Sequence, residues 1–477
     1  MDSHELGSSG AHRGSIGEML VIALPMVVSH ACDTAMTFTD RLFLAKLAPV
    51  QMSAAMSGGI CCFMMMTFWL GLISYSTALV AQYLGAGRRR HCAVVTTQAL
   101  LIVVVAYPAI LLARPAAHAL FAAMNVPAEQ LALQTVYFNI LLYGSIIGLV
   151  RAALSGFFSG IGRTRVVMLA ALVSMSVNIL MNWVLIFGKL GAPALGIRGA
   201  AYGTILGGVV GIAVLIAAYL RPAIRRAYGV ANAWRLDRAA LKALIRFGYP
   251  AGIEMALNML AFTALVMTFQ AVDAATGAAI TIVFNWDMVC FVPMIGINVG
   301  VVSLVGRYMG AREPDIAHRA TMSGLRLALV WSALILVAFA VFAGPLVGVF
   351  RPAEAGGVFE TARPLAVFML RLASLYVMAD AVMLVFSGAL RGAGDTFWAM
   401  CVSVGFHWLF LPITMIMLRV WHVDPKSTWV VLVVMIMAFS GVFYLRYRGG
   451  RWRTIRIVGL AGEAVPPVVG VPELPEG

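Results

Sequence analysis

Charged residues are scarce in this chain. Asp, Glu, Lys and Arg make up only 11% of its 477 residues, against about 25% in an ordinary soluble domain. Apolar residues make up 62% of the chain, and its mean hydropathy is +0.93. This composition argues against a soluble protein and predicts an all-α polytopic membrane protein.

Motifs for several common chemistries are also missing. The sequence contains no Walker loop, metal-ligand cluster or nucleophile triad, so we expect neither an ATP-driven pump nor an enzyme, and no cofactor. No secretory signal precedes the first apolar segment, because the polar start of the chain runs directly into it. The cysteines lack metal-ligand spacing and are predicted to be free, buried thiols: Cys32, Cys61, Cys62, Cys92, Cys290 and Cys401.

Twelve apolar segments are long enough to span a bilayer, which takes about 20 residues. Prolines inside five of them predict kinks: Pro25, Pro108, Pro250, Pro293 and Pro412. The predicted spans are 19–43, 52–81, 93–113, 131–155, 166–187, 200–220, 248–272, 278–306, 322–343, 365–389, 397–418 and 429–446.

Basic residues fall unevenly between these spans. If the N-terminus is cytoplasmic, Lys and Arg are more than twice as numerous in the inner segments as in the outer ones. This bias predicts that both termini are cytoplasmic. We interpret the formal net charge of +14 as contact with anionic lipid headgroups, with no nucleic-acid partner.

The two halves of the chain repeat one another. One offset aligns Pro25 with Pro250, Gly71 with Gly296, and LVAQYLGA (79–86) with LVGRYMGA (304–311). A slightly larger offset aligns the glycines and threonine of GFFSGIGRT (156–164) with those of GALRGAGDT (388–396). Six helices per half is an even number, so both halves enter the membrane from the same side. We therefore expect two parallel six-helix repeats around a central cavity.

This repeat predicts five parts. They are an N-terminal cytoplasmic tail (1–18), an N-lobe (19–220), a basic cytoplasmic linker (221–247), a C-lobe (248–446) and a C-terminal cytoplasmic tail (447–477).

A few carboxylates lie at predicted membrane depth, where an ionised group costs about 2.5–3.5 kcal/mol on insertion scales. Asp33 and Asp40 share one helical face, with Thr37 between them and His30 one turn before. The second half contributes Glu254, Asp287 and Asp380. Buried carboxylates that bind either a proton or a cation are the groups that an ion-driven transporter needs.

Structural alternatives exist for most of these groups. Asp40 can pair with its neighbour Arg41, Asp33 can bond His30, and Glu254 can be solvated at the inner end of its helix. Asn178 and Asn182 lie one turn apart, which suits either a binding site or an interhelical hydrogen bond. Met64–Met66 is better explained by packing than by a drug-binding surface. Asp380 has no basic residue within one helical turn, so it is the strongest candidate.

Four stretches resemble one known family over nearly the whole chain. They are IALPMVVSHACDTAMTFTDRLFLAKL (22–47), LVAQYLGAGR (79–88), NILMNWVLIFGKLGAPALGIRGAAYGT (178–204) and YVMADAVMLVFSGALRGAGD (376–395). The chain resembles the multidrug and toxic compound extrusion (MATE) transporters, and its last stretch is similar to the NorM-type branch. The resemblance implies export of organic cations or amphiphiles driven by Na⁺ or H⁺, with two lobes that rock between outward- and inward-facing states.

The resemblance also implies roles for particular residues. Asp40 stands in the acidic motif of the first helix, and Asn178, Asn182 and Thr204 stand at positions that line the N-lobe pocket. Asp380 and Tyr376 occupy cation-site positions, so Na⁺ is expected at Asp380, Glu254 or Asp40. One departure is Asn258, which stands where the branch carries a glutamate; Glu254 lies one turn earlier and is a candidate substitute.

The sequence therefore predicts a monomeric multidrug antiporter of the inner membrane, with Asp380 as the principal coupling residue. The alternative within the same superfamily is a flippase for lipid-linked precursors. Arg151 and Arg371, which lie inside predicted helices, are the residues that favour it. A membrane-embedded enzyme would need a site such as Asp287 with His407.

Overall fold

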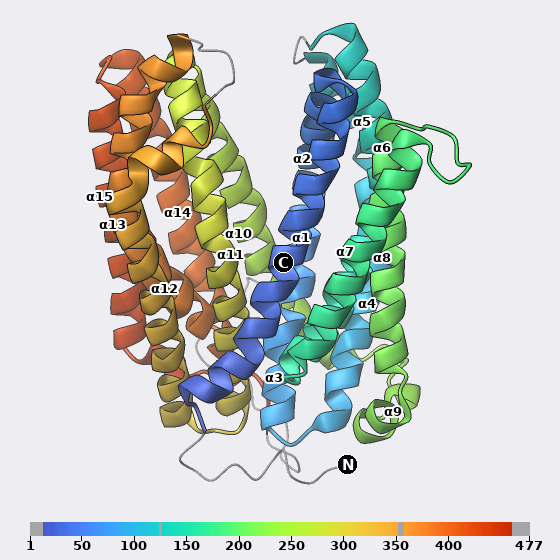
Figure 1. Cartoon of the computed structure of the whole chain (residues 1–477). Helices are drawn as coiled ribbons and strands as arrows, with labels where there is room; N and C mark the ends of the chain where they lie inside the picture. Colours follow the sequence, from blue (N-terminus) through green and yellow to red (C-terminus); the bar gives the residue numbers. More distant parts are fainter. Residues whose placement is uncertain (1–12, 124–125, 352–356, 460–477) are drawn as a thin grey trace. The chain divides into compact units, whose positions relative to one another are not determined.

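The computed structural model describes residues 13–123, 126–351 and 357–459, and within them the secondary structure is helical (Figure 1). The long helices are α1 (Ile16–Leu47), α2 (Pro49–Ser74), α4 (Arg89–Leu112), α6 (Ala128–Gly160), α7 (Thr164–Phe187), α8 (Ile197–Tyr219), α10 (Arg238–Gln270), α11 (Ala274–Gly310), α12 (Pro314–Gly348), α13 (Gly357–Ala393), α14 (Thr396–Met415) and α15 (Pro425–Arg448). The shorter α-helices are α3 (Ser76–Gly85), α5 (Arg114–Ala123) and α9 (Pro222–Tyr228).

Twelve helical segments of the described chain are long and apolar enough to cross a membrane, as predicted. Each contains one predicted span, give or take two residues at an end. The segments are mostly longer than predicted: α11 runs from Ala274 to Gly310, whereas its apolar stretch suggested 278–306. Hydropathy detects only the apolar centre, and the backbone hydrogen bonds continue through polar end turns that it cannot see.

Irregular backbone occurs near two of the prolines inside these helices, one expected and one not. The five expected positions all lie inside helices, and only Pro412 is followed closely by an irregular turn, the π-helical Ile416–Val420. The clearest break is in α12, where Phe342 has φ −103° and ψ 16°, three residues before Pro345. Pro345 was not among the expected kinks. A proline removes one backbone donor and its ring collides with the preceding turn, so the distortion appears just before it.

The helices form two compact units. Unit 2 comprises chiefly Leu24–Ala256, and unit 1 comprises chiefly Leu257–Arg456 together with the first turns of α1, up to Ala23. Both unit boundaries therefore fall inside a helix, α1 in one case and α10 in the other. Met19, whose side chain is fully buried, belongs to the core of unit 1.

The internal repeat is confirmed by matching backbone details in the two units. Gly160 packs against Thr77 and Val80 in unit 2, where a Cβ would lie 2.8 Å from the Thr77 carbonyl oxygen. Gly392 packs in the same way in unit 1, against the residues that the repeat aligns with Thr77 and Val80, namely Val302 and Val305. The same small residue lets two helix backbones approach closely in each half.

The turns of the repeat match as well. Arg88 N–H bonds Tyr83 O at 2.9 Å, and Glu313 N–H bonds Tyr308 O at 2.8 Å, both closing the end of a helix. The left-handed residue of the first turn is Gly87 (φ 76°), whereas the second turn has Arg312 (φ 59°). Arg312 adopts a left-handed conformation that glycine would adopt more easily. The surrounding turn therefore imposes this conformation.

All six cysteines have free thiols, as predicted, but they are not all buried. Cys401 on α14 is exposed and Cys61 is partly exposed. The apolar run around Cys401 suggested burial because hydropathy cannot distinguish a face that packs on protein from a face that meets lipid.

Candidate binding cavity

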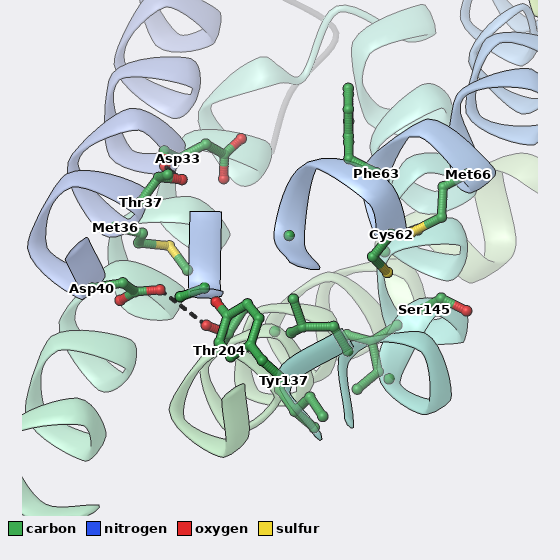
Figure 2. Close-up of a pocket in the computed structure, with 18 of the residues that line it drawn as sticks. Asp33, Met36, Thr37, Asp40, Cys62, Phe63, Met66, Tyr137, Ser145 and Thr204 are labelled. Carbon is green, nitrogen blue, oxygen red and sulfur yellow. Dashed lines mark hydrogen bonds between the residues drawn. The ribbon is translucent and has the colours of Figure 1, made fainter. Parts of the chain in front are cut away.

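A cavity of about 560 Å³ lies within unit 2, between α1, α2, α6, α7 and α8. Asp33, Thr37 and Asp40 all line it from one face of α1, the face predicted from their spacing. Figure 2 shows these side chains in succession along the helix, with Phe63 and Met66 projecting from α2. The volume is within the range typical of small-molecule sites, about 300–1,000 Å³.

Most of the cavity wall is apolar. Its larger side chains include Met36, Met56, Ile60, Phe63, Met66, Leu141 and Ile205. Met66 belongs to the methionine run that we attributed to packing, so that interpretation is incomplete: this thioether faces the cavity. Flexible, polarisable methionines adapt to ligands of different shape.

Glycines on α6 and α8 allow the helices to approach one another around the cavity. A Cβ at Gly144 would lie 2.6 Å from Ile205 Cγ1, and a Cβ at Gly208 would lie 2.7 Å from Ile147 Cγ2. Both glycines line the cavity. Small residues at such crossings are the usual means by which membrane helices pack tightly.

Asp40 lies at the centre of a hydrogen-bonded cluster. Thr204 donates its hydroxyl to Asp40 Oδ2 at 3.1 Å, the contact drawn in Figure 2, and Asn182 donates its amide to Asp40 Oδ1. Asn178 donates to Thr204 Oγ1 at 3.4 Å and accepts from Asn182 at 3.3 Å. Asp40 is 8% exposed and both asparagines are fully buried. The structure thus brings together the four residues that the resemblance placed at this pocket.

The cluster stabilises an oxygen-rich pocket rather than an ion pair. In the described part of the chain, Asp40 forms no salt bridge with Arg41, the alternative that the sequence left open. Asn182 Oδ1 is buried without a hydrogen-bond partner. A buried carbonyl oxygen without a donor beside a carboxylate and a hydroxyl is a donor set that suits a hard cation or a proton-bearing group.

Asp33 is not bonded to His30, which was the structural alternative for it. Instead Arg151 on α6 holds it in a two-point ion pair, with Nη1 2.7 Å from Oδ1 and Nη2 3.1 Å from Oδ2. The two side chains are 35% and 32% exposed, and both line the cavity. The sequence suggested Arg151 only as a flippase feature; an arginine within an apolar span is itself the signal that a carboxylate partner exists.

A second acidic cluster lies in unit 1. Tyr376 on α13 donates its hydroxyl to Asp287 Oδ1 on α11 at 2.9 Å. Asp380 lies one turn after Tyr376 on α13 and interacts electrostatically with Asp287 and with Tyr376. The structure therefore groups three predicted residues from two helices.

Glu254 and Asn258 fall on different sides of the unit boundary within α10. Glu254 is 4% exposed and belongs to unit 2. Asn258 belongs to unit 1, where its amide donates to Ser403 Oγ at 2.7 Å. The position that carries a glutamate in the resembled branch is therefore occupied here by an amide bonded to α14.

The enzyme hypothesis rested on Asp287 and His407. Asp287 accepts from Tyr376, and the ring of His407 bonds the Ser403 carbonyl at 2.8 Å. In the described residues, no group of three or more His, Cys, Asp or Glu side chains is arranged to hold a metal ion.

A repeated helical bundle of twelve candidate spans, with a cavity that contains carboxylates, is typical of membrane transporters. The MatE family model matches residues 25–184 and 250–416, more than half of the chain. The chain belongs to this family, the MATE transporters, and is therefore a multi-pass membrane protein and not an enzyme.

Individual relatives agree with this assignment. The chain is 27% identical to a "Probable multidrug resistance protein NorM" of Synechococcus sp. over 83% of this chain and 86% of that protein. It is 24% identical to a protein of the same name in Shewanella oneidensis, over 95% and 99% of the two chains. A crystal structure described as MATE in complex with MaL6 superposes with a TM-score of 0.82 at 21% identity, covering 94% of this chain and all of that one.

Proposed function

We propose that this protein is a secondary active exporter that antiports organic cations or amphiphilic drugs against Na⁺ or H⁺ by rocker-switch alternating access. The observation that carries the proposal is Asp40, a buried carboxylate at the wall of a mostly apolar cavity of drug-sized volume. An apolar wall with a few convergent polar groups is the general form of a small-molecule site. The relatives named as multidrug resistance proteins support the same substrate class.

The coupling step follows from competition for negative charge. A carboxylate that binds a proton or Na⁺ loses its attraction for a cationic substrate, so cation entry lowers substrate affinity. That reciprocal change is the differential interaction that alternating access requires. Asp40 with Asn178, Asn182 and Thr204 would provide this chemistry in unit 2, and Asp33 lines the same cavity.

Asp380 is proposed as the principal coupling residue, with Asp287 and Tyr376 as its neighbours in unit 1. Two carboxylates in electrostatic contact favour uptake of one shared cation, because both cannot remain charged without cost. Na⁺ would be held at Asp380 or Asp40, with Glu254 as a further carboxylate on α10. The two units share a scaffold but carry different acidic groups, so we propose that they couple asymmetrically.

We also propose that the protein works as a monomer in the inner membrane with both termini in the cytoplasm. The distribution of Lys and Arg supports this orientation. The basic segment after α8, with Arg221, Arg225 and Arg226 at or in α9, would then contact anionic headgroups.

Transport in proteoliposomes tests the proposal. Efflux of a fluorescent organic cation is measured with a Na⁺ gradient or a pH gradient imposed separately, for the wild type, Asp40→Asn and Asp380→Asn. We expect one gradient to drive wild-type efflux and both variants to lose it. Full ion-driven efflux in both variants would contradict the coupling assignment.

The flippase alternative receives little support from the cavity. A polyanionic headgroup would need several free cations along the wall. Arg151 is committed to Asp33, Arg41 is the neighbour of the carboxylate Asp40, and Arg371 is exposed in unit 1. Lipid-linked sugar movement in the same vesicles, without drug efflux, would favour the flippase instead.

A further inference from the structure

The charged side chains that line the cavity balance one another. Within the described residues, they are Asp33, Asp40, Arg41 and Arg151. Arg41 is an exposed neighbour of Asp40 on the same helix, whereas Arg151 reaches across from α6 and holds both oxygens of Asp33. The two carboxylates therefore differ in availability, although they share one face of one helix.

Asp40 remains available to a cation. Its oxygens accept from an amide and a hydroxyl, which are neutral donors, and among the described side chains it forms no ion pair, although Arg41 lies nearby. Asp33 instead makes two charge-assisted bonds in the fork geometry that is the strongest arrangement for a guanidinium and a carboxylate. A ligand cation can reach Asp33 only by displacing Arg151, which would leave that guanidinium beside the ligand's own positive charge.

We infer that Arg151 is a specificity-determining residue: a tethered cation that occupies Asp33 and so restricts the cavity to organic cations with one positive charge. The inference rests on the proposed function and narrows its substrate class. Asp33 and Asp40 are seven residues apart, or about 10 Å along the axis at about 1.5 Å per residue. Without Arg151 the cavity would offer two separated carboxylates and suit a ligand with two separated charges.

Two matched ligands report on this difference. Hexyltrimethylammonium has one quaternary ammonium on a six-carbon chain, and hexamethonium has one at each end of the same chain. Binding of each to the purified full-length protein is measured by titration calorimetry at neutral pH and fixed ionic strength. The quantity compared is the ratio of the two dissociation constants, which cancels changes that affect both ligands equally.

We expect the wild type to bind the monocation at least as tightly as the dication. Arg151→Gln should shift the ratio toward hexamethonium by about tenfold, which corresponds to about 1.4 kcal/mol. Arg151→Lys keeps the positive charge and should change the ratio by less than about twofold. The double variant Asp33→Asn/Arg151→Gln should return to the wild-type ratio, because the freed carboxylate is gone.

Arg371→Gln is the matched control, since it makes the same change at an exposed site in unit 1. Arg151→Met, which keeps the apolar stem, replaces Arg151→Gln if that variant unfolds. The inference is overturned if Arg151→Gln or Arg151→Met leaves the ratio of dissociation constants unchanged. It is also overturned if the shift toward hexamethonium persists in the double variant, or if the wild type binds hexamethonium more tightly than the monocation.

The proposed function is tested separately by Asp40→Asn, which should weaken both ligands. Undiminished binding of both ligands in Asp40→Asn would contradict the role of Asp40, while the ratio measured at Arg151 would still stand. If Asp40→Asn weakens the binding of both ligands but Arg151→Gln leaves their ratio unchanged, only the inference about Arg151 is overturned.

Discussion

Tyr376 donates its phenolic hydroxyl to Asp287 over 2.9 Å, joining α13 to α11. The ring of Tyr376 packs edge-on against Trp429, with centroids 6.1 Å apart, so the hydroxyl is held in place by the core of unit 1. A rigid donor beside Asp287 fixes the orientation of that carboxylate.

Tyr376→Phe removes this donor and keeps the ring. We expect unfolding free energy to fall by about 1 kcal/mol, the usual worth of one hydrogen bond, and ion-driven efflux to fall as well. Thermal unfolding in detergent and vesicle transport measure the two effects. Tyr444→Phe is the control at an exposed position, and equal effects in both variants would exclude a specific role for Tyr376.

Asp380→Asn preserves side-chain size and removes the charge. If Asp380 couples ion flow to export, efflux driven by the effective gradient should fall at least about tenfold, since proton or cation uptake at this position is lost. Substrate binding should change less. Asp315→Asn, at a carboxylate that is 88% exposed in an ion pair with Arg453, should transport normally.

Thr204→Val tests the Asp40 cluster with almost no change in shape. Asp40 loses one donor and Asn178 loses an acceptor, leaving buried polar atoms unpaired at a cost of about 1–3 kcal/mol. We expect lower stability and altered drug affinity, measured by unfolding and fluorescence titration. Thr204→Ser keeps the hydroxyl and should have the stability and drug affinity of the wild type. If Thr204→Val behaves like the wild type, the hydroxyl is dispensable.

Gly203→Ala tests the close approach of α8 to α7. A Cβ at Gly203 would collide with Asn182 Oδ1 and lie 3.2 Å from the backbone nitrogen of Asn182. The crowding should displace Asn182 from Asp40 and destabilise the protein by about 1–3 kcal/mol. Gly441→Ala, in the middle of α15 with nothing within 4 Å of the new Cβ, should be neutral or stabilising by up to about 1 kcal/mol.

Asp273 gives a pH-dependent contribution outside the membrane spans. It caps α11, and the hydrogen bond from the Thr276 backbone N–H holds the pKa of its carboxyl below the usual value. Because the folded state binds its proton less readily, the stabilisation is present above the unfolded pKa, about 3.9. It fades as pH falls through the lower folded pKa.

Asp273→Ala should therefore lower stability by about 1 kcal/mol at pH 7, and the difference from the wild type should shrink toward pH 3. Melting temperatures of both proteins over this pH range provide the measurement. If the difference in melting temperature between the two proteins is constant with pH, the charge of the Asp273 cap contributes nothing to stability.

The number of spans, the repeat and the acidic residues could be predicted from the sequence. Bilayer thickness sets the length of each apolar segment, and unpaired backbone groups in lipid force each segment to be helical. The repeat is visible because the close approach of Gly160 to Thr77, and of Gly392 to Val302, accepts only the smallest residue.

Partners across helices were decided by the tertiary structure. Helical periodicity predicts neither the ion pair of Asp33 with Arg151 nor the place of Glu254 in unit 2, because the neighbouring residues come from elsewhere in the chain. Periodicity fixes which side chains share a face, whereas only packing fixes what that face meets. The sequence alone determined that Asp33 and Asp40 point the same way; the fold decided that Arg151 pairs with Asp33, whereas Asp40 accepts from Asn182 and Thr204.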